Sequence, residues 1–350
     1  MKIDFKSFDI NQLLPKTDFE QKTFSFVKEW FSDSKEVEVQ TSGSTGAAKV
    51  LKVSKEKMLN SAEMTCNFLE LKPGDTALLC LPLEYISGKM MVVRSLARGL
   101  TLNVVDPSLH PLEELKERIG FCAMTPLQVE NSLNSISKIE KLIIGGAGVS
   151  ESLKKKLHEV LSSETNKEGE NATVIYETYG MSETLSHIAL KQLYPIEQDY
   201  FTLFEGIEIK LDSRRALVIN APKVSDELIQ TNDLVELIGK DKFRFLGRTD
   251  NVINSGGAKI RPEELETLVK KKIPQEAVFV GVKDEFLGEK LILVIEGEES
   301  KEVISEVKEV SFEKKFHRPK EILFLKEIPR TPNGKISRPQ LKRWLEEQVN

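Results

Sequence analysis

The sequence predicts an α/β protein with a large N-terminal domain, whose sheets are covered by helices, and a small mobile C-terminal α+β domain. Apolar runs rich in β-branched residues recur as far as residue 220, helix-like patterns separate them, and the order of elements changes near residue 250. The chain has 350 residues, of which 40% are hydrophobic. That length and composition allow a sizeable core in two domains.

The strand-like runs of the large domain are mostly apolar, as in strands that are covered on both faces. They are residues 75–83 (DTALLCLPL), 101–106 (TLNVVD), 141–146 (KLIIGG), 173–180 (TVIYETYG) and 216–220 (ALVIN). Helix-like patterns occupy residues 54–71 and 150–163. Strands that alternate with helices favour a largely parallel sheet, and ligands gather at the carboxyl ends of its strands.

After residues 247–262 (GRTDNVINSGGAKIRP) the pattern becomes helix, strand, strand, helix, strand. The predicted ranges are 262–272, 276–284, 289–297, 300–315 and 320–327. Residues 1–247 are therefore expected to form the large domain and residues 250–350 the small one.

Composition argues against several classes of function. The net charge is −5 and the cationic residues are spread along the chain, so no nucleic-acid partner is expected. No window approaches the roughly 18 apolar residues of a membrane span, and the N-terminus does not resemble a signal peptide, so a cytoplasmic location is expected. Cys66, Cys80 and Cys122 are widely separated among apolar neighbours, which predicts buried thiols with neither a disulfide framework nor a metal cluster.

Residues 41–49 (TSGSTGAAK) combine two glycines, four hydroxyl residues and a lysine between a strand-like and a helix-like run. Backbone N–H groups, hydroxyls and a terminal cation are what a polyphosphate requires. A Walker A loop is excluded, because Gly43 and Gly46 are too close and Lys49 follows Ala48. Taken alone, such a stretch is also typical of a linker or a turn.

Four more islands of unusual composition follow: 176–184 (YETYGMSET), 231–237 (TNDLVEL), 247–266 and 328–338 (IPRTPNGKISR). Each has an ordinary interpretation, such as a turn-forming Asp233 or a solvated loop lysine at Lys335. In this order and spacing, the five islands resemble the adenylate-forming superfamily of acyl-CoA synthetases, peptide-synthetase adenylation domains and luciferases. The resemblance covers the chain from about Val39 to its end.

The resemblance implies an enzyme that uses ATP, Mg²⁺ and CoA to convert a small carboxylic acid, through an acyl-adenylate, into a thioester. It assigns ATP binding to Thr41, Ser42, Gly43, Ser44, Thr45, Gly46, Lys49, Gly146, Ala147, Tyr179, Gly180, Ser182, Asp233 and Arg248. Tyr179 would stack on adenine, and Asp233 would hold the ribose diol. The sequence departs from the family at Ala48, where proline is usual, and at Ser182, where threonine is usual.

The catalytic residues implied by the resemblance are Lys335, Lys49 and Glu183, and Glu183 would also hold Mg²⁺. Lys335 would bridge the attacking carboxylate and the phosphate oxygens, where charge develops. Asp250 matches the hinge about which the small domain rotates. Gly256 and Gly257, with Ser255 and Ala258 beside them, would then face the large domain and leave room for pantetheine.

Residues 81–99 (LPLEYISGKMMVVRSLARG) resemble the corresponding stretch of short bacterial o-succinylbenzoate-CoA ligases of menaquinone biosynthesis. The predicted acyl pocket contains Tyr85 as a gate, Lys89 and Arg94 as cations for a second carboxylate, Gly145 and His187. The pattern alone leaves another interpretation open, in which Arg94 lies on the outer face of an amphipathic helix. For His187, a satisfied or partly exposed side chain is the simpler expectation.

Three alternatives remain. The acid could be another aromatic or fatty acid. A domain that loads a carrier protein would normally offer an Asp to an amino-acid ammonium group, and around residues 84–90 only Glu84 is acidic. A non-catalytic adenylate-binding module is the most distant alternative. The phosphate loop starts earlier than in the family, so we expect a shortened large domain whose exposed surface a homodimer could cover.

Overall fold

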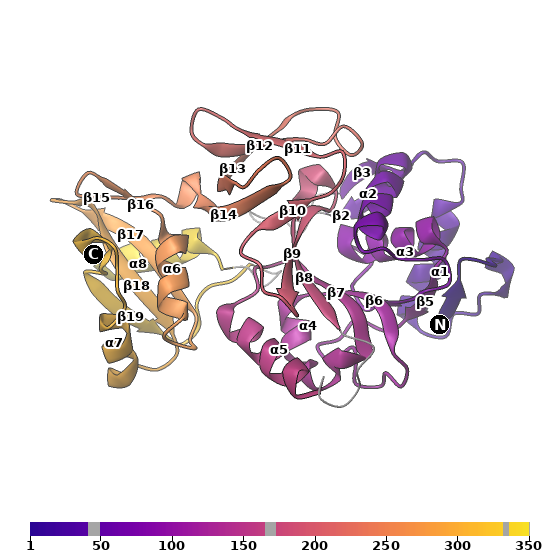
Figure 1. The fold of residues 1–350 in the computed structure, drawn as a ribbon, viewed down its shortest axis with the longest axis horizontal. Coiled ribbons are helices and arrows are strands. Elements are labelled where there is room, and N and C mark those ends of the chain that lie inside the picture. Colours follow the sequence, from indigo (N-terminus) through magenta and orange to yellow (C-terminus); the bar gives the residue numbers. More distant parts are fainter. Residues whose placement is uncertain (41–49, 165–172, 332–335, 350) are drawn as a thin grey trace.

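The computed structural model describes residues 1–40, 50–164, 173–331 and 336–349. Two parts lie side by side in Figure 1, joined near residue 250. The first, coloured indigo to orange, contains a twelve-stranded sheet, and the second, orange to yellow, contains a five-stranded sheet. The predicted mixed α/β class is therefore confirmed. No helix among the described residues is both long and apolar enough to cross a membrane.

Half of the large sheet is parallel and follows the predicted alternation of strands and helices. Its neighbouring parallel strands are β5 (Thr101–Val104), β4 (Thr76–Leu79), β6 (Ile119–Met124), β7 (Ile139–Ile144) and β8 (Val174–Gly180). At the edge, β1 (Lys2–Asp4) pairs with β5 in the antiparallel direction. The predicted parallel arrangement is thus found in this half of the sheet.

Helices cover both faces of the parallel half. One face carries α1 (Asp18–Trp30), α2 (Lys55–Phe68) and α3 (Ile86–Arg98), and the other carries α4 (Pro126–Glu130) and α5 (Glu151–Glu164). Short 3₁₀ turns occur at η1 (Ile10–Gln12) and η2 (Leu133–Lys138). Alternate strand residues face opposite cores: Leu79 and Phe121 pack with α1 to α3, whereas Leu78 and Leu142 pack with α5. All three cysteines are free and buried, as predicted.

The other half of the large sheet is antiparallel; of its strands only β12 was predicted, as residues 216–220, and the antiparallel direction was not. Its strands, in spatial order, are β9 (His187–Tyr194), β10 (Phe201–Leu203), β14 (Lys242–Arg248), β13 (Ile229–Leu237), β12 (Ala216–Asn220) and β11 (Glu208–Leu211). The 3₁₀ turn η3 (Ser182–Thr184) connects β8 to β9. A separate hairpin of β2 (Glu36–Gln40) and β3 (Val50–Ser54) pairs Gln40 with Val50, on either side of residues 41–49.

The smaller part has cores of its own, formed by residues from Ile253 onward. Its strands are β16 (Ala258–Ile260), β15 (Ile253–Ser255), β18 (Gly288–Glu296), β17 (Ala277–Asp284) and β19 (Glu321–Leu325). Its helical elements are η4 (Thr249–Asn251), α6 (Pro262–Lys270), α7 (Lys301–Lys308), η5 (Lys315–His317) and α8 (Arg338–Val349). Helix α7 ends before the predicted residue 315, because the chain turns to bury Val310 in the core.

Candidate active site

The turn between β8 and β9 has a strained backbone, with a close approach of the strands at Gly180 and a γ-turn at Leu185. A Cβ atom on Gly180 would lie 2.4 Å from the Cα of His187, so the close approach of the two strands requires glycine. Leu185 has a φ of 61°, and the N–H of Ser186 donates to the carbonyl of Thr184 at 2.7 Å. A γ-turn with positive φ is rare and strained, and such strain concentrates at functional sites.

Arg94, on α3, points into the protein and meets this turn. Its side chain is buried, and its Nη2 donates to Ser186 Oγ at 2.7 Å. Its Nε has no hydrogen-bond partner, and no carboxylate pairs with Arg94 in the part of the chain that the structure describes. Burial lowers the pKa of Arg94 to about 10, so the group remains a cation at neutral pH. The interpretation that placed Arg94 on an outer helix face is therefore wrong.

His187 lies beside Arg94 and is also buried. Its Nδ1 lies 3.2 Å from Ser186 Oγ, and its Nε2 lies 3.1 Å from Thr65 Oγ1, on α2. Burial, and to a smaller extent the charge of Arg94, holds the pKa of His187 well below its ordinary value. A neutral imidazole with two polar partners results, and it belongs to the same cluster as the cation.

The second predicted cation, Lys89, faces a different neighbour. Its Nζ lies 4.7 Å from the centre of the Phe26 ring on α1, and burial lowers its pKa. Five residues along a helix turn a side chain well away from the starting direction. Arg94 and Lys89 are therefore not brought together. Tyr85, the proposed gate, precedes α3 and pairs with Gln40, directly before residues 41–49.

A second cluster joins four of the predicted nucleotide and hinge residues. Asp233 accepts a hydrogen bond from the Tyr179 hydroxyl at 2.5 Å and another from Arg248 Nη1 at 2.9 Å. The same guanidinium donates two hydrogen bonds to Asp250, from Nε at 2.9 Å and from Nη2 at 2.8 Å. The bonds from Arg248 hold the pKa of Asp250 below its ordinary value. One arginine thus connects the predicted ribose ligand with the predicted hinge.

The ring of Tyr179 packs among other aromatic side chains. Its ring packs against Phe243 and Phe201, with centroids 4.9 Å and 5.6 Å away. Burial, together with the neighbouring Asp233 carboxylate, raises the pKa of the phenol. Stacking of this ring on adenine stays a prediction.

Strand β7 pairs with β8, and Gly145, Gly146 and Ala147 follow directly after its last residue, Ile144. Glu177, on β8, accepts a hydrogen bond from the N–H of Val149 at 3.0 Å and forms an ion pair of 2.6 Å with Lys191. It therefore fixes the chain directly after the glycine-rich strand end. The sequence analysis missed Glu177, although a carboxylate in the middle of an apolar strand was a usable signal.

The remaining predictions for this site have different outcomes. Ser182 and Glu183 lie exposed in η3, beside the turn just described. An exposed carboxylate suits Mg²⁺, which takes one or two protein carboxylates and completes its shell with water and substrate phosphates. The predictions for Thr41, Ser42, Gly43, Ser44, Thr45, Gly46, Lys49 and Lys335 lie outside the described residues. Gly256 and Gly257 form the β15–β16 turn, which points away from β8 and β9 in Figure 1.

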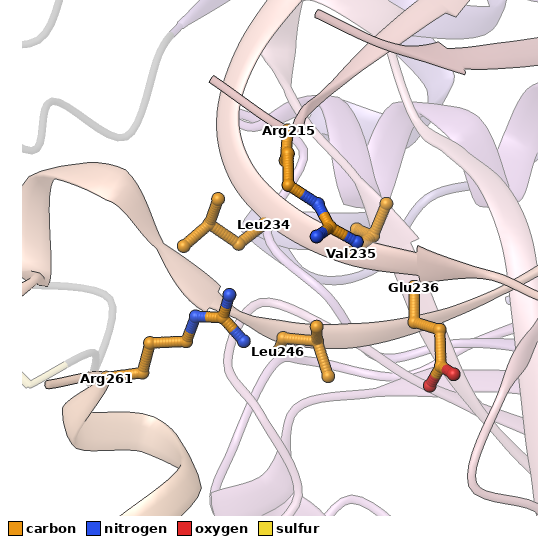
Figure 2. A pocket seen from close by; sticks show the side chains of 6 residues that line it. All are labelled: Arg215, Leu234, Val235, Glu236, Leu246 and Arg261. Atoms are coloured by element: carbon orange, nitrogen blue, oxygen red, sulfur yellow. The ribbon is translucent and has the colours of Figure 1, made fainter. Parts of the chain in front are cut away.

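A pocket of about 200 Å³ lies on another surface of the antiparallel half. Figure 2 shows its lining side chains, which are Arg215, Leu234, Val235, Glu236, Leu246 and Arg261. None of them is a predicted site residue. Leu234 follows Asp233 on β13, and alternation along the strand turns the two side chains to opposite faces. This pocket is therefore separate from the Asp233 cluster.

Comparison with known proteins agrees with the resemblance in the sequence. The sequence profile of the AMP-binding enzyme family matches residues 39–211. The 2-succinylbenzoate--CoA ligase of Escherichia coli (strain K12) is 27% identical over 328 residues, which cover 88% of this chain and 68% of that protein.

Two solved structures share the fold. A protein from Dyadobacter fermentans DSM 18053, described as acyl-CoA synthetase (AMP-forming)/AMP-acid ligase II-like, is 32% identical with a TM-score of 0.66. The match covers 100% of this chain and 99% of that one. The O-succinylbenzoate Coenzyme A Synthetase of Bacillus subtilis, in complex with ATP and magnesium ion, is 22% identical with a TM-score of 0.69 and matches over 87% of this chain and 69% of that one.

Proposed function

This chain belongs to the family of AMP-binding enzymes, the AMP-forming acyl-CoA synthetases, and from that premise we propose that it is an acid-thiol ligase for o-succinylbenzoate. In this reaction one carboxylate of the acid attacks the α-phosphate of ATP, which releases pyrophosphate and leaves an acyl-adenylate. The thiolate of CoA then attacks the acyl carbon and displaces AMP. The product is o-succinylbenzoyl-CoA, an intermediate of menaquinone biosynthesis.

The observation that carries the choice of acid is the buried Arg94, which has no carboxylate partner among the described residues. A cation removed from water without a counter-ion costs several kcal/mol unless a ligand supplies the missing charge. An acid with two carboxylates can react through one and pair with Arg94 through the other, and a carboxylate matches the guanidinium fork. A benzoate or fatty acid with a single carboxylate would leave the cation unpaired. The name of the E. coli relative supports the same acid.

Other residues of the chain would bind the nucleotide and the metal. Asp233 would hold the ribose diol, with Arg248 fixing the position of its carboxylate. Glu183 would bind Mg²⁺, which neutralises phosphate charge as pyrophosphate leaves. Lys335 and the residues at 41–49 would stabilise the charge that develops around the α-phosphate and the leaving group. The ATP and magnesium ion in the B. subtilis structure support this set of cosubstrates.

We further propose that the two half-reactions use two orientations of the small part, residues 250–350, relative to residues 1–247. Asp250 would be the hinge, and Gly256 and Gly257 would approach the pantetheine arm after rotation. The separate hydrophobic cores on either side of residue 250 support an independent movement. A cytoplasmic location and a homodimer belong to the same proposal, and exposed Val50 and Leu51 are apolar surface that a second copy could cover.

Pyrophosphate release with ATP and Mg²⁺, followed by detection of the CoA thioester, tests the function. We expect both products with o-succinylbenzoate and little of either with benzoate, medium-chain fatty acids or amino acids. Turnover with another acid would support the assignment as a ligase but would assign a different substrate. Release of pyrophosphate without a CoA thioester would favour transfer to a carrier protein. If no acid gives pyrophosphate release although the protein has a normal circular dichroism spectrum, the result would favour the non-catalytic adenylate-binding module.

A further inference from the structure

We propose that His187, with Ser186 and Thr65, is a relay that fixes the orientation of the Arg94 guanidinium and so sets the preference for a dicarboxylate over a monocarboxylate. The proposal rests on the proposed function, because it concerns the acid that Arg94 would bind. In this view His187 is a positioning residue that acts through Arg94.

The direction of each hydrogen bond in the relay follows from what the groups can donate. Arg94 Nη2 can only donate, so Ser186 Oγ accepts at 2.7 Å. The Ser186 hydroxyl hydrogen is then free to donate to His187 Nδ1, 3.2 Å away. A neutral imidazole that accepts at Nδ1 carries its hydrogen on Nε2, which can donate to Thr65 Oγ1 at 3.1 Å.

The far end of the relay is anchored in a helix. The Thr65 hydroxyl donates to the carbonyl of Ser61 at 3.1 Å, one turn earlier in α2. Every hydroxyl and ring nitrogen in the series therefore has one consistent role, and the series runs in one direction from Arg94 to the backbone of α2. Chains of hydrogen bonds that run in one direction reinforce each other.

The relay determines which N–H groups of Arg94 remain for a ligand. Nη2 uses one of its hydrogens on Ser186. Nε has no partner among the residues that the structure describes, and Nη1 has only the weak acceptor Met91 Sδ at 3.9 Å. A carboxylate is bound best when two parallel N–H groups point at it. A guanidinium free to rotate would lose that alignment even though its charge would remain.

The competing explanation is that His187 is only a packed aromatic residue. Its ring meets Phe204 edge-on, with centroids 5.4 Å apart, and it is buried. Packing alone would make the loss grow with the volume removed, so that Asn would be more harmful at this position than Gln. The relay instead makes the acceptor at the Nδ1 position the important atom.

Two amide variants separate these explanations. In His187→Asn, the amide can place an oxygen near the former Nδ1 and keep the bond from Ser186. In His187→Gln, the amide reaches the former Nε2 and Thr65 but leaves Ser186 without its acceptor. Both variants lose the ring and its contact with Phe204, and Gln is the larger of the two, so packing alone and the relay predict opposite orders of harm. Thr65→Val keeps the shape of Thr65 and removes the anchor in α2.

The kinetic experiment compares o-succinylbenzoate with 4-phenyl-4-oxobutanoate, the same molecule without the ring carboxylate. We measure kcat and KM for pyrophosphate release, with thermal melts as a control for folding. His187→Gln should raise KM for o-succinylbenzoate by about tenfold or more, with kcat within about threefold and KM for the monocarboxylate unchanged. His187→Asn should keep the wild-type preference within about threefold, and Thr65→Val should lie between the two.

Equal losses in His187→Asn and His187→Gln, or equal losses for the two acids, would overturn the relay. Calorimetric titration of o-succinylbenzoate into each protein separates this proposal from the function. If the wild type releases no pyrophosphate but binds the acid in a way that His187→Gln weakens and His187→Asn preserves, the ligase assignment fails and the relay stands. If the wild type turns over and the two variants behave alike, only the relay fails. Absence of both binding and turnover rejects both.

Discussion

Arg94 is a side chain that folding alone would not favour. It is a buried cation whose Nε lacks a partner among the described residues, and a hydrophobic residue of similar volume would avoid that desolvation. Its presence makes sense if the side chain is kept for a ligand, because functional sites commonly trade stability for binding. Stability and substrate affinity should therefore respond to this residue in opposite directions.

Arg94→Met tests that trade directly. We expect the free energy of unfolding without ligand to rise by about 1 kcal/mol or more, because an unpaired buried charge is replaced by an apolar chain. The KM for o-succinylbenzoate should rise by about a hundredfold, which lies within the range expected when one partner of a buried charge pair is lost. Urea denaturation and steady-state kinetics measure the two effects.

Lys89→Met is the comparison variant on the same helix. Lys89 faces Phe26 and not the Arg94 cluster, so we expect a KM within about threefold of the wild type. A large KM effect in Lys89→Met, or an Arg94→Met protein that is strongly destabilised with unchanged KM, would contradict the assignment of the second carboxylate to Arg94.

The lowered pKa of His187 predicts that the stability of the folded protein depends on pH. Its folded-state pKa lies below the ordinary value near 6.5, so the unfolded chain binds a proton first as the pH falls. The stability that depends on a neutral His187 is complete above about pH 6.5 and is lost as the pH falls below it. Between pH 7.5 and 5.5 the wild type should therefore lose stability.

The control for this pH effect is His187→Asn, which has no titrating ring. Urea denaturation at the two pH values should show a smaller decrease in the free energy of unfolding in this variant than in the wild type. An equal decrease in both proteins would mean that His187 does not differ in protonation between the folded and unfolded states.

Among the elements, β13, β14 and η4 meet at one guanidinium. Arg248 ends β14 and binds Asp233 of β13 and Asp250 of η4. A lysine would keep the charge and lose the fork that holds both carboxylates at once. Arg248→Lys should therefore raise KM for ATP by about tenfold and slow both pyrophosphate release and thioester formation. An unchanged KM for ATP in a folded variant would mean that this cluster does not contact the nucleotide.

The elements also show what the sequence could and could not predict. Strands β4 and β7 each contain a short apolar run that ends near a turn, so their residues alone identified them. Among the antiparallel strands, β11, β13 and β14 mix buried or half-buried residues with exposed ones, so these strands and their pairing had no comparable signal. Thr65 and His187 touch across 122 positions of sequence, and a contact of that kind is created only by the fold.

On the scale of the whole molecule, the two parts meet closely at Gly247. This residue has a φ of 133°, and a Cβ atom on it would lie 2.5 Å from Glu263 Oε2 on α6. Gly247→Ala should therefore lower the free energy of unfolding by about 1–3 kcal/mol, through backbone strain and the clash. Chemical denaturation measures this change.

Gly239→Ala is the matched control. Gly239 also has a positive φ, of 77°, but no atom lies within 4 Å of a Cβ added there. Its cost should be limited to the backbone, about 1 kcal/mol. If Gly239→Ala is as harmful as Gly247→Ala, the contact between β14 and α6 contributes nothing measurable.

The measurement that tests the central claim most directly is pyrophosphate release by the unmodified chain with two acids, o-succinylbenzoate and 4-phenyl-4-oxobutanoate. Only the ring carboxylate differs between them, and Arg94 is the group proposed to bind it. The account predicts a kcat/KM for o-succinylbenzoate that is at least about a hundredfold higher. Equal values for the two acids, or a preference for the monocarboxylate, would contradict it.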